Sequence, residues 1–394
     1  MPSILIYRHL LLPPSETFIV AQTTAMKRYV PFFVCTALVP NGLELPAGSI
    51  CTLGTGNSLW ERLHRRLYRT AGLLRRKILL PIVERRPALI HAHFATDACA
   101  ALPLVEKLKI PLVVTLHGFD VHITDAGFNQ LDFGRHYLAR RERLWKVAKC
   151  FICVSDHNRR KAIERGFPPE KLWLHYIGID VNKFRPTPEI EREQIVLFVG
   201  RLIENKGCIH LIRAMAQVQA KAPAVRLVII GDGPLKADLK NAAESSLKNY
   251  QFLGSQSSAV VKQWLTRCRI FSGPSVVASN GNSEGLGIVF CEAQAMGVPV
   301  VSFATGGIPE VVVHGEGGLL AKERDETMLA EYILRFLNNP ELWRQASEAG
   351  RKYVELKFDL RRQTELLEAK YDELIAAEPS QPKFGLDRLI TSLR

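Results

Sequence analysis

Two glutamates separated by seven residues mark the stretch of this sequence that is best suited to chemistry. Glu284 precedes two closely spaced glycines, and Glu292 lies eight positions after it. Two helical residues at this spacing would share one face, because eight residues make little more than two turns. The glycines instead predict that Glu284 lies in the loop opening a helix over residues 288–296, with Glu292 inside that helix.

The start of such a helix offers hydrogen-bond donors beside the two carboxylates. The amides that can point toward an anion are those of Gly285, Leu286, Gly287 and Ile288. The helix dipole favours negative charge at this end, and carboxylates accept hydrogen bonds from hydroxyl groups. Amides that hold a phosphate, next to acids that hold a polyol, describe a site for a sugar nucleotide.

Two cations follow the first apolar strand of the second half of the chain. Arg201 and Lys206 come after the strand expected at residues 195–199, and Gly207 opens the next helix. Arg presents a planar fork of donors and Lys a point charge, so the pair suits a diphosphate. Both could equally be solvated loop charges when taken alone. The carboxylate pair further along the chain favours the diphosphate.

Glycine-rich turns end two further strands. Gly231 follows residues 225–230, where glycine lets a nucleotide approach the backbone, although a simple tight turn explains it better in isolation. Gly306 and Gly307 also suit close approach by a ligand. Glu310 is explained equally well as an acid in the first turn of a helix and as a ligand contact.

Histidines follow two strands of the first half. His117 comes after residues 112–115, where it can hydrogen-bond a sugar hydroxyl or assist proton movement. His91 and His93 have the spacing of two metal ligands, but no third ligand accompanies them, so we predict no metal site.

Polar residues also precede the first helix. Ser15 is a candidate N-cap and Glu16 a first-turn acid, which explains both without a ligand. Their position beyond a strand also suits contact with a second substrate, and the same role is considered for His93.

The segment 60–86 is strongly basic, and its cations alternate with apolar residues at helical spacing. Its cations include Arg62, Arg65, Arg66, Arg69, Arg75, Arg76 and Lys77. A helix of this kind can lie on an anionic bilayer. It can equally be an ordinary amphipathic helix that packs on a sheet. Nucleic acid is a less favoured partner, because the aromatic residues are not interleaved with the cations in the way that a base-stacking surface needs.

These side chains need a scaffold of parallel strands. Short apolar runs alternate with longer amphipathic stretches, which predicts parallel sheets covered by helices on both faces. The strands are expected at residues 4–7, 32–38, 89–93, 112–115, 150–154, 172–176, 195–199, 225–230, 250–253, 270–272 and 298–302. The helices are expected at residues 16–29, 96–107, 156–165, 207–221, 235–247, 259–266 and 288–296.

A turn-rich segment at residues 178–188 divides the pattern in two. We therefore expect two doubly wound Rossmann-like domains, at residues 1–178 and 186–358. A long helix should follow at 359–377 and a loose tail at 378–394. Ligands of such sheets bind beyond the carboxyl ends of the strands, so the site is expected in a cleft that the two domains face.

Bulk composition agrees with two globular domains. The chain has 394 residues and a formal net charge of +13, which suggests polyanionic partners such as nucleotide phosphates or anionic lipid. Its eight cysteines lack a disulfide framework, which favours a reducing cytosol, and Cys150 and Cys153 should be buried in a strand. We expect neither a signal peptide nor a membrane-spanning helix.

Together, these motifs resemble those of the retaining glycosyltransferases of family four, which have the two-domain GT-B fold. The resemblance covers roughly residues 1–375. It is strongest at the Glu-x7-Glu pair and at the segments 199–207, 231–235 and 306–310. Residues 14–19 and 91–94 further resemble members that assemble bacterial exopolysaccharides. One departure is the segment 8–14, which stands where many members carry a Gly-Gly loop.

The resemblance implies transfer of a sugar from a nucleotide-diphosphate sugar to a hydroxyl of a carbohydrate or polyprenyl-linked acceptor, with retained configuration. Arg201 and Lys206 would hold the diphosphate, Glu284 a sugar hydroxyl and Glu292 the ribose. The amides of residues 285–288 would line sugar and phosphate, and His117 would lie near the transferred sugar. The C-terminal helix would cross back onto the first domain.

The resemblance also implies that no cofactor and no essential metal are needed, which agrees with the lack of an Asp-x-Asp pair in the sequence. We expect a cytoplasmic protein, peripheral on the inner face of the cell membrane if the basic segment binds lipid. Other functions on this fold are a nucleotide-sugar hydrolase, phosphorylase or epimerase, or a non-catalytic membrane-bound sensor of nucleotide sugars. The sequence does not predict the donor base, the sugar, the acceptor, the linkage or the oligomeric state.

Overall fold

The computed structural model describes residues 1–13, 15–39, 42–46, 48–53, 67–68, 73–187, 190–377 and 390. The chain divides into two compact units. Unit 1 consists of Met1–Val154, Arg159–Gly178 and Leu360–Arg394. Unit 2 consists of Ser155–Asn158 and Ile179–Asp359.

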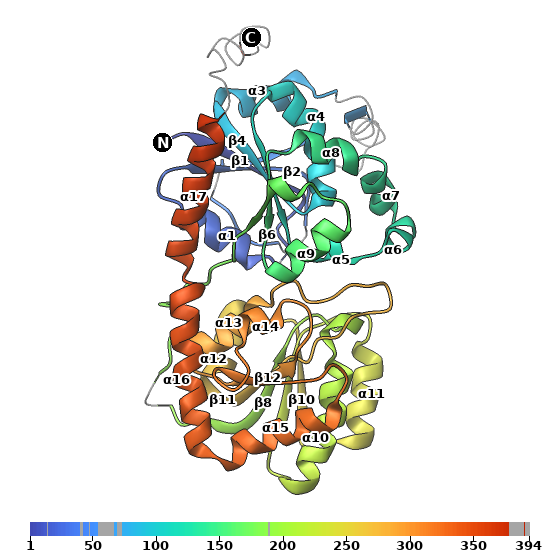
Figure 1. The fold of residues 1–394 in the computed structure, drawn as a ribbon, viewed down its shortest axis with the longest axis vertical. Helices are drawn as coiled ribbons and strands as arrows, with labels where there is room; N and C mark the ends of the chain where they lie inside the picture. Colours follow the sequence, from blue (N-terminus) through green and yellow to red (C-terminus); the bar gives the residue numbers. More distant parts are fainter. Residues whose placement is uncertain are drawn as a thin grey trace. The chain divides into compact units, whose positions relative to one another are not determined.

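Unit 1 is built on a seven-stranded parallel sheet in the order β3-β2-β1-β4-β5-β6-β7 (Figure 1). The strands are β1 (Ser3–Leu11), β2 (Val30–Leu38), β3 (Ile50–Thr52), β4 (Pro87–His93), β5 (Leu112–Leu116), β6 (Cys150–Cys153) and β7 (Leu172–Leu174). The chain reverses direction across the sheet between β1 and β4. Ligands of doubly wound sheets bind at such a switch point.

Both faces of this sheet are covered, which is why its strands read as continuous apolar runs. Successive side chains of a strand point to opposite faces. In β1, Leu5 and Tyr7 accordingly belong to one hydrophobic core, and Ile4 and Ile6 belong to the other. All four side chains are fully buried.

Helices lie on both sides of the sheet of unit 1. They are α1 (Thr17–Thr24), α3 (Arg76–Glu84), α4 (Ala95–Leu108), α5 (Phe119–His122), α6 (Asp125–Asn129), α7 (Asp132–Leu138), α8 (Arg141–Val147), α9 (Asp156–Glu164), which belongs to unit 1 from Arg159 onward, and α17 (Leu360–Ala376). Helices α3 and α4 contribute to the core that contains Leu5, and α1 and α17 to the core that contains Ile4.

Helix α17 is held against unit 1 by buried polar contacts. The Glu368 side chain is 1% exposed, and its Oε1 accepts hydrogen bonds from the amides of Lys27 at 2.9 Å and Arg28 at 2.7 Å. The Tyr29 hydroxyl donates to Asp372 at 2.6 Å. These contacts explain why α1 ends at Thr24, earlier than the expected helix over residues 16–29, because the following amides bond to α17.

Unit 2 contains a six-stranded parallel sheet in the order β10-β9-β8-β11-β12-β13. The strands are β8 (Glu193–Val199), β9 (Arg226–Ile230), β10 (Tyr250–Gly254), β11 (Cys268–Ser272), β12 (Val300–Phe303) and β13 (Gly318–Ala321). The chain reverses between β8 and β11, so this sheet too has a switch point, and the candidate site is built there.

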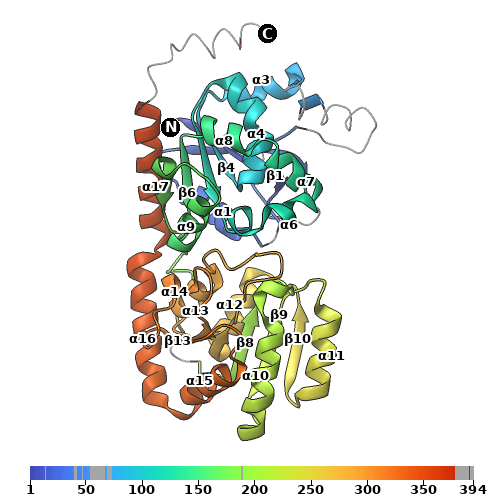
Figure 2. The ribbon, with the colours of Figure 1, turned by 45° about the vertical axis from the view of Figure 1, so that its right-hand side comes forward.

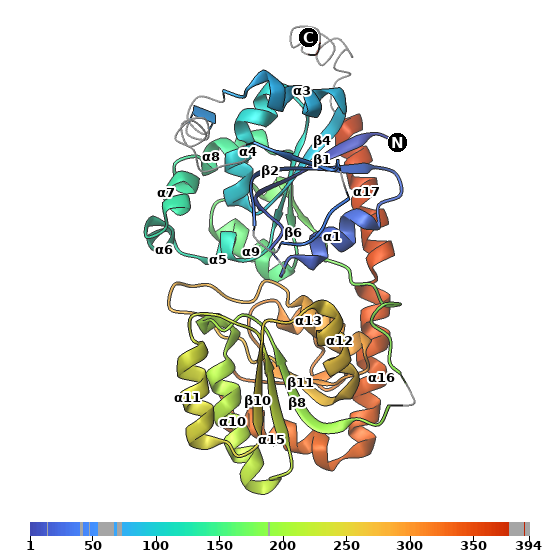
Figure 3. The ribbon, with the colours of Figure 1, turned by 180° about the vertical axis from the view of Figure 1, so that it is seen from behind.

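The helices of unit 2 also cover both faces of its sheet. They are α10 (Cys208–Lys221), α11 (Lys236–Ser246), α12 (Ser258–Arg267), α13 (Ile288–Ala295), α14 (Ile308–Val311), α15 (Glu326–Asn338) and α16 (Pro340–Lys357). Figure 2 shows α10 and α11 side by side, and α10 also contacts α15. Figure 3 shows α12 on the other side, where it contacts β8 and β11.

The two-unit α/β architecture predicted from the sequence is confirmed. The pattern did not predict β3, β13, α15 or α16, and it ended the first strand at Tyr7 where β1 continues to Leu11. Cys150 and Cys153 are buried in β6, and all eight cysteines are free. In the described ranges, no helix has the length and apolar character that crossing a membrane requires. The expected tail at 378–394 lies outside the described residues, apart from Ile390.

Glu368→Ala should destabilise unit 1, because it removes a buried carboxylate that accepts two backbone hydrogen bonds. We expect the free energy of unfolding to fall by about 2–4 kcal/mol. Glu365→Ala is the control. Its carboxylate is exposed and forms only a surface ion pair with Lys27, so about 1 kcal/mol or less should be lost. Urea unfolding, with hydrogen exchange at the Lys27 and Arg28 amides, measures both. Equal effects of the two substitutions would contradict this account.

Candidate functional site

The carboxyl ends of β8 and β11 bring together the predicted cation and the first predicted glutamate. The Lys206 Nζ lies 2.5 Å from the Glu284 Oε2, although 77 residues of chain separate them. The Ser275 hydroxyl donates to the same oxygen at 3.3 Å. Glu284 is 9% exposed, so the ion pair is largely withdrawn from water, where electrostatic interactions are stronger than at a surface.

Arg201 lies five residues before Lys206 and is exposed. Its side chain forms no ion pair or hydrogen bond with any residue in the described part of the chain. A guanidinium at the end of β8 with no protein partner is available to an anionic ligand.

Helix α13 begins directly after Glu284, as the sequence predicts. Gly287 precedes the first helical residue with a φ of 85°, a conformation that favours glycine. Within the described residues, the amides of Gly285, Leu286 and Gly287 donate to no backbone or side-chain acceptor. Three free donors at a helix start can bind an anion.

Glu292 lies inside α13, one helix turn beyond its start. Its side chain is half-buried and has no hydrogen-bond partner among the described residues. Burial raises its pKa to about 7, and the nearby charge of Lys183 only partly offsets this. An unpartnered buried carboxylate with a perturbed pKa is the mark of a binding or catalytic group.

The paired glycines at Gly306 and Gly307 pack closely against the protein backbone. A Cβ at Gly306 would lie 2.3 Å from the carbonyl oxygen of Glu284, and one at Gly307 would lie 2.2 Å from that of Gly285. The Gly307 amide donates to the Glu284 carbonyl at 2.9 Å. The expected close approach is therefore made by the loop that carries Glu284.

Gly231 shows the same behaviour at the end of β9. A Cβ there would lie 1.8 Å from the carbonyl oxygen of Gly200, the residue before Arg201. The sequence suggested a tight turn or a nucleotide contact at Gly231, but it did not predict this backbone contact. It holds the Arg201 loop against the end of β9.

The loop before Glu284 is fastened to the loop that carries Lys206. The Glu204 carboxylate accepts hydrogen bonds from the Ser279 amide at 3.0 Å and from its hydroxyl at 2.8 Å. The Val276 amide donates to the Asn205 carbonyl at 3.0 Å. Sequence reasoning missed both contacts. These contacts join the two loops and so fix the position of Lys206 relative to Glu284.

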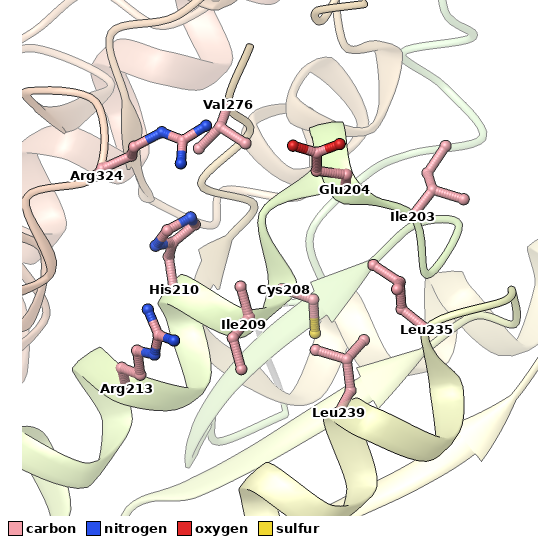
Figure 4. A pocket seen from close by; sticks show the side chains of 10 residues that line it. All are labelled: Ile203, Glu204, Cys208, Ile209, His210, Arg213, Leu235, Leu239, Val276 and Arg324. Carbon is pink, nitrogen blue, oxygen red and sulfur yellow. The ribbon is translucent and has the colours of Figure 1, made fainter. Parts of the chain in front are cut away.

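A pocket of about 250 Å³ lies beside these joined loops (Figure 4). It is lined by Ile203, Glu204, Cys208, Ile209, His210, Arg213, Leu235, Leu239, Val276 and Arg324. None of the site residues predicted from the sequence lines it. Glu204 and Val276 line the pocket and also take part in the loop contacts described above.

Glu310 binds protein amides. Its carboxylate accepts hydrogen bonds from the Asp156 amide at 2.7 Å and the His157 amide at 2.8 Å, within unit 2. Glu310 also lies in the first turn of α14. Ser155 in the same short segment donates to the Gly285 carbonyl at 2.6 Å, so this segment supports the loop before α13.

In unit 1, the carboxyl end of β1 carries a buried charge cluster. Arg8 donates to the Glu16 carboxylate at 2.9 Å and 2.5 Å and also pairs with Asp97. Arg8 was expected after the end of the first strand, but it lies within β1. The predicted N-cap role of Ser15 is wrong. Ser15 is exposed, and Glu16 is the N-cap residue, with its carboxylate turned toward Arg8.

The predicted histidines form a stacked row at the ends of β4 and β5. The His91 and His93 rings lie 4.4 Å apart, and the His93 and His117 rings 5.3 Å apart. The His93 Nδ1 is 3.0 Å from the His117 Nε2. Burial lowers the pKa of His93 and of His117 well below the usual range. Both imidazoles are therefore neutral at pH 7, and one must donate a hydrogen bond to the other.

Within the described residues, no three side chains of His, Cys, Asp or Glu gather as a metal-binding group. His91 bonds the Tyr371 hydroxyl at 2.5 Å and the Thr115 hydroxyl at 2.7 Å, which explains it as a structural residue. Of the basic segment, Trp60, Arg62, Arg65, Arg66 and Arg69 lie outside the described residues. The described part continues from Leu73 into α3.

Two family models match this chain. Residues 27–183 match a family model described as Glycosyltransferase Family 4, and residues 180–353 match one described as Glycosyl transferases group 1. A GDP-mannose-dependent monoacylated alpha-(1-6)-phosphatidylinositol monomannoside mannosyltransferase of Corynebacterium glutamicum is 32% identical over 282 residues. This alignment covers 68% of this chain and 70% of that protein. The chain belongs to glycosyltransferase family 4.

A second relative and a solved structure are also similar to this chain. The amylovoran biosynthesis glycosyltransferase AmsK of Erwinia amylovora is 31% identical over 274 residues, which cover 66% of this chain and 65% of AmsK. The chain thus spans just under two thirds of that relative's length. The structure of Anabaena Alr3699/HepE in complex with UDP and glucose superposes with a TM-score of 0.75 at 19% identity. It covers 94% of this chain and all of that one, which shows a shared GT-B fold.

Glu292→Gln should change how the stability of this family 4 glycosyltransferase depends on pH. Between the unfolded pKa near 4.5 and the folded pKa of about 7, the native state holds more protons at Glu292, so stability falls as pH rises through this window. The Gln variant escapes this loss. Relative to the wild type, it should gain roughly 1–3 kcal/mol between pH 5 and pH 8.

Urea unfolding of both proteins at pH 5 and pH 8 measures this difference. Glu331→Gln, which changes an exposed carboxylate of α15, is the matched control and should show no such dependence. A Glu292→Gln difference that is the same at both pH values would show that the carboxyl titrates normally.

Proposed function

We propose that this protein transfers a sugar from a nucleotide-diphosphate sugar to a hydroxyl of a carbohydrate or lipid-linked carbohydrate, with retained configuration and without a metal ion. The transfer would serve the synthesis of a polysaccharide or glycoconjugate. The donor is bound by unit 2, through Arg201, Lys206, the amides at the start of α13, Glu284 and Glu292. Residues of unit 1, His117 among them, contact the transferred sugar and the acceptor.

The observation that carries this proposal is the contact between Lys206 and Glu284 at a sheet switch point, beside three free amides. A cation, an exposed guanidinium and amide donors suit a diphosphate. Two carboxylates suit hydroxyl groups of a sugar and a ribose. A site for phosphate alone would not require the acids, and a site for a neutral sugar would not require the cations.

The same groups suit the chemistry of transfer. As the bond from the anomeric carbon to the phosphate oxygen breaks, negative charge develops on the departing diphosphate. Arg201, Lys206 and the α13 amides are placed to stabilise that charge, which is usually the largest contribution to catalysis. In the proposed front-face reaction, the acceptor oxygen bonds the same face of the anomeric carbon and its proton passes to the departing phosphate oxygen. Trapping of a covalent glycosyl-enzyme would overturn this mechanism.

The electrostatic state of His117 supports a reaction without a protein base. Efficient general bases have a pKa near the working pH, whereas burial lowers the pKa of His117 well below its usual range. His117 is therefore proposed to orient a hydroxyl by hydrogen bonding. The departing phosphate is proposed as the proton acceptor.

Relatives narrow the donor to a class. HepE was crystallised with UDP, and the Corynebacterium protein is GDP-mannose-dependent. The two names share a nucleoside diphosphate and differ in the base, so the proposal extends to the diphosphate and not to the base. A thermal-shift screen of nucleoside diphosphates and their sugars identifies the base, because ligand binding to the native state raises the melting temperature.

Substitution of the two proposed donor contacts tests the function. Glu284→Gln and Arg201→Ala should each lower kcat/KM for transfer by about 30- to 1,000-fold, since each removes roughly 2–4 kcal/mol of transition-state stabilisation. Transfer is followed with the donor found in the screen. The anomeric configuration of the product, determined by NMR, should equal that of the donor. Glu331→Gln is the control and should retain full activity.

Other outcomes identify other functions. Donor cleavage that does not depend on an acceptor hydroxyl indicates a hydrolase, and cleavage by inorganic phosphate indicates a phosphorylase. A donor sugar with inverted stereochemistry indicates an epimerase. Binding without turnover of any donor indicates a sensor. Equal turnover by the wild type and both variants would refute the site assignment.

We further propose that the protein acts in the cytoplasm and contacts anionic membrane through the start of α3. Leu73 is 56% exposed, and Arg76 and Lys77 are exposed on the first turn of the helix. Leu79, Ile82 and Val83 point into the core, so α3 has one face on the unit and a basic face outward. An exposed apolar residue beside cations suits an anionic bilayer surface.

Reversal of charge at Arg75, Arg76 and Lys77 to Glu should weaken binding to phosphatidylglycerol vesicles about 100-fold or more, at roughly 1 kcal/mol for each of the three cations. Vesicle co-sedimentation measures this. The matched control reverses Lys221, Lys240 and Lys248 of unit 2, which are exposed and change the net charge equally. A similar loss of vesicle binding in both variants would show that only the net charge matters and would contradict a specific role of α3. Unchanged binding of the α3 variant would refute the membrane proposal.

A further inference from the structure

A row of aromatic side chains lies at the carboxyl ends of neighbouring strands in unit 1. The Phe18 ring lies 5.0 Å from the His117 ring, and the Phe94 ring lies 4.5 Å from it. Phe119 follows at 5.1 Å from Phe94, and Phe133 at 6.3 Å from Phe119. We call Phe18, Phe94, Phe119 and Phe133 the aromatic patch.

The sheet topology places this patch where a ligand binds. Phe18 lies on α1 after β1, Phe94 directly after β4 and Phe119 on α5 after β5. These three strands are adjacent in the order β1-β4-β5 and include the switch point of unit 1. Carboxyl ends of parallel strands at a switch point are the usual ligand edge of a doubly wound sheet.

The aromatic patch is partly exposed to solvent. Phe133 is 49% exposed, and Phe18, Phe94 and Phe119 are half-buried. By contrast, aromatic residues of the strand cores such as Phe33 and Phe151 are almost fully buried. Apolar residues that are grouped on a surface, at a ligand edge, mark an interaction site more often than residues scattered singly.

Phe94 has a backbone conformation that is unusual for a residue with a side chain. Its φ of 72° lies in the region that favours glycine, and such strain in a residue with a Cβ is concentrated at functional sites. The Arg8 guanidinium lies 4.5 Å from the centre of the Phe94 ring, and His117 and Phe119 contact the ring as well. The buried charge cluster of β1 therefore supports the patch from within.

We propose that the aromatic patch binds a sugar ring of the acceptor by stacking. This proposal rests on the proposed transferase function and names the surface that receives its acceptor. A pyranose has a face of C–H bonds, which carry partial positive charge and pack on the electron-rich face of an aromatic ring. Its edge carries hydroxyl groups, which need hydrogen-bond partners.

The composition of the patch fits this amphiphilic ligand better than an alkyl chain. His117 lies between Phe18 and Phe94, so a polar ring with hydrogen-bonding nitrogens interrupts the apolar surface. An alkyl chain would leave such a group without a partner, which is unfavourable. Small-molecule sites combine apolar walls with a few placed polar groups, as here.

Ligand-observed NMR tests the binding without requiring turnover. The probes are methyl α-D-glucopyranoside and methyl α-D-mannopyranoside for sugars, citronellyl phosphate for lipid, and UDP and GDP for the donor nucleotide. Saturation transfer from wild-type protein should reach the C–H protons of at least one glycoside. Phe18→Ala with Phe133→Ala should reduce that signal at least threefold and leave the signal of the bound nucleotide unchanged. Phe133→Tyr should preserve both.

Leu356→Ala is the matched control, because Leu356 is a 64% exposed apolar residue of unit 2, and all signals should remain. Loss of the nucleotide signal in the double variant would overturn the proposal in favour of donor stacking. Saturation of citronellyl phosphate without any glycoside signal would overturn it in favour of a lipid. A glycoside signal that survives the double substitution would also overturn it.

Once the acceptor of the transfer reaction is known, kinetics give a second readout. Phe133→Ala should raise the KM for the acceptor by about 2- to 10-fold, which is the worth of one aromatic contact, and should leave the KM for the donor unchanged. An unchanged acceptor KM overturns the patch assignment while the transferase function stands. The absence of any transfer in the wild type counts against the function, and the NMR result then decides the patch alone.

Discussion

The ion pair between Lys206 and Glu284 is the contact on which the candidate site depends. It joins loops at the ends of β8 and β11, and its 2.5 Å separation is maintained by neighbouring contacts, since Glu204 binds Ser279 and Gly307 binds the Glu284 carbonyl. A lysine that pairs with a largely buried carboxylate is held in place. An incoming diphosphate would compete for the same ammonium group, so its arrival would free Glu284 to accept a hydroxyl. Under the proposed function, the pair would therefore link the binding of the donor's diphosphate to the binding of its sugar.

Local sequence was sufficient to place the main site elements. Glycines after Glu284 predicted a loop before a helix, and α13 begins at Ile288. Arg201 and Lys206 were predicted from their position after an apolar strand, which is a local property. Parallel topology then brings strand ends together at one edge of each sheet, so residues distant in sequence become neighbours without any further information. This is why the fold, the position of Lys206 after β8 and the position of Glu284 before α13 could be predicted.

What the sequence could not predict depends on partners elsewhere in the chain. Gly306 reads as a ligand contact until the Glu284 carbonyl is seen 2.3 Å from where its Cβ would lie. Arg8 reads as a loop residue because a charge is unusual in a central strand, and only Glu16 and Asp97 make its burial tolerable. The early end of α1 likewise depends on Glu368, more than 330 residues away. The strands β3 and β13 are too short to show a clear pattern of apolar residues in the sequence.

The position of α17 in the chain has a consequence for the order of folding. Unit 1 takes one face of its core from residues synthesised after all of unit 2, since Tyr371 and Leu367 pack against side chains of β1 and β4. Protein synthesis runs from the amino terminus, and domains generally fold as units during it. Unit 2 can therefore complete its core while the ribosome is still adding the last helix. The first half of the protein to be made would be the last to mature, and until then its sheet would expose Ile4, Ile6 and Leu89 to chaperones and to aggregation.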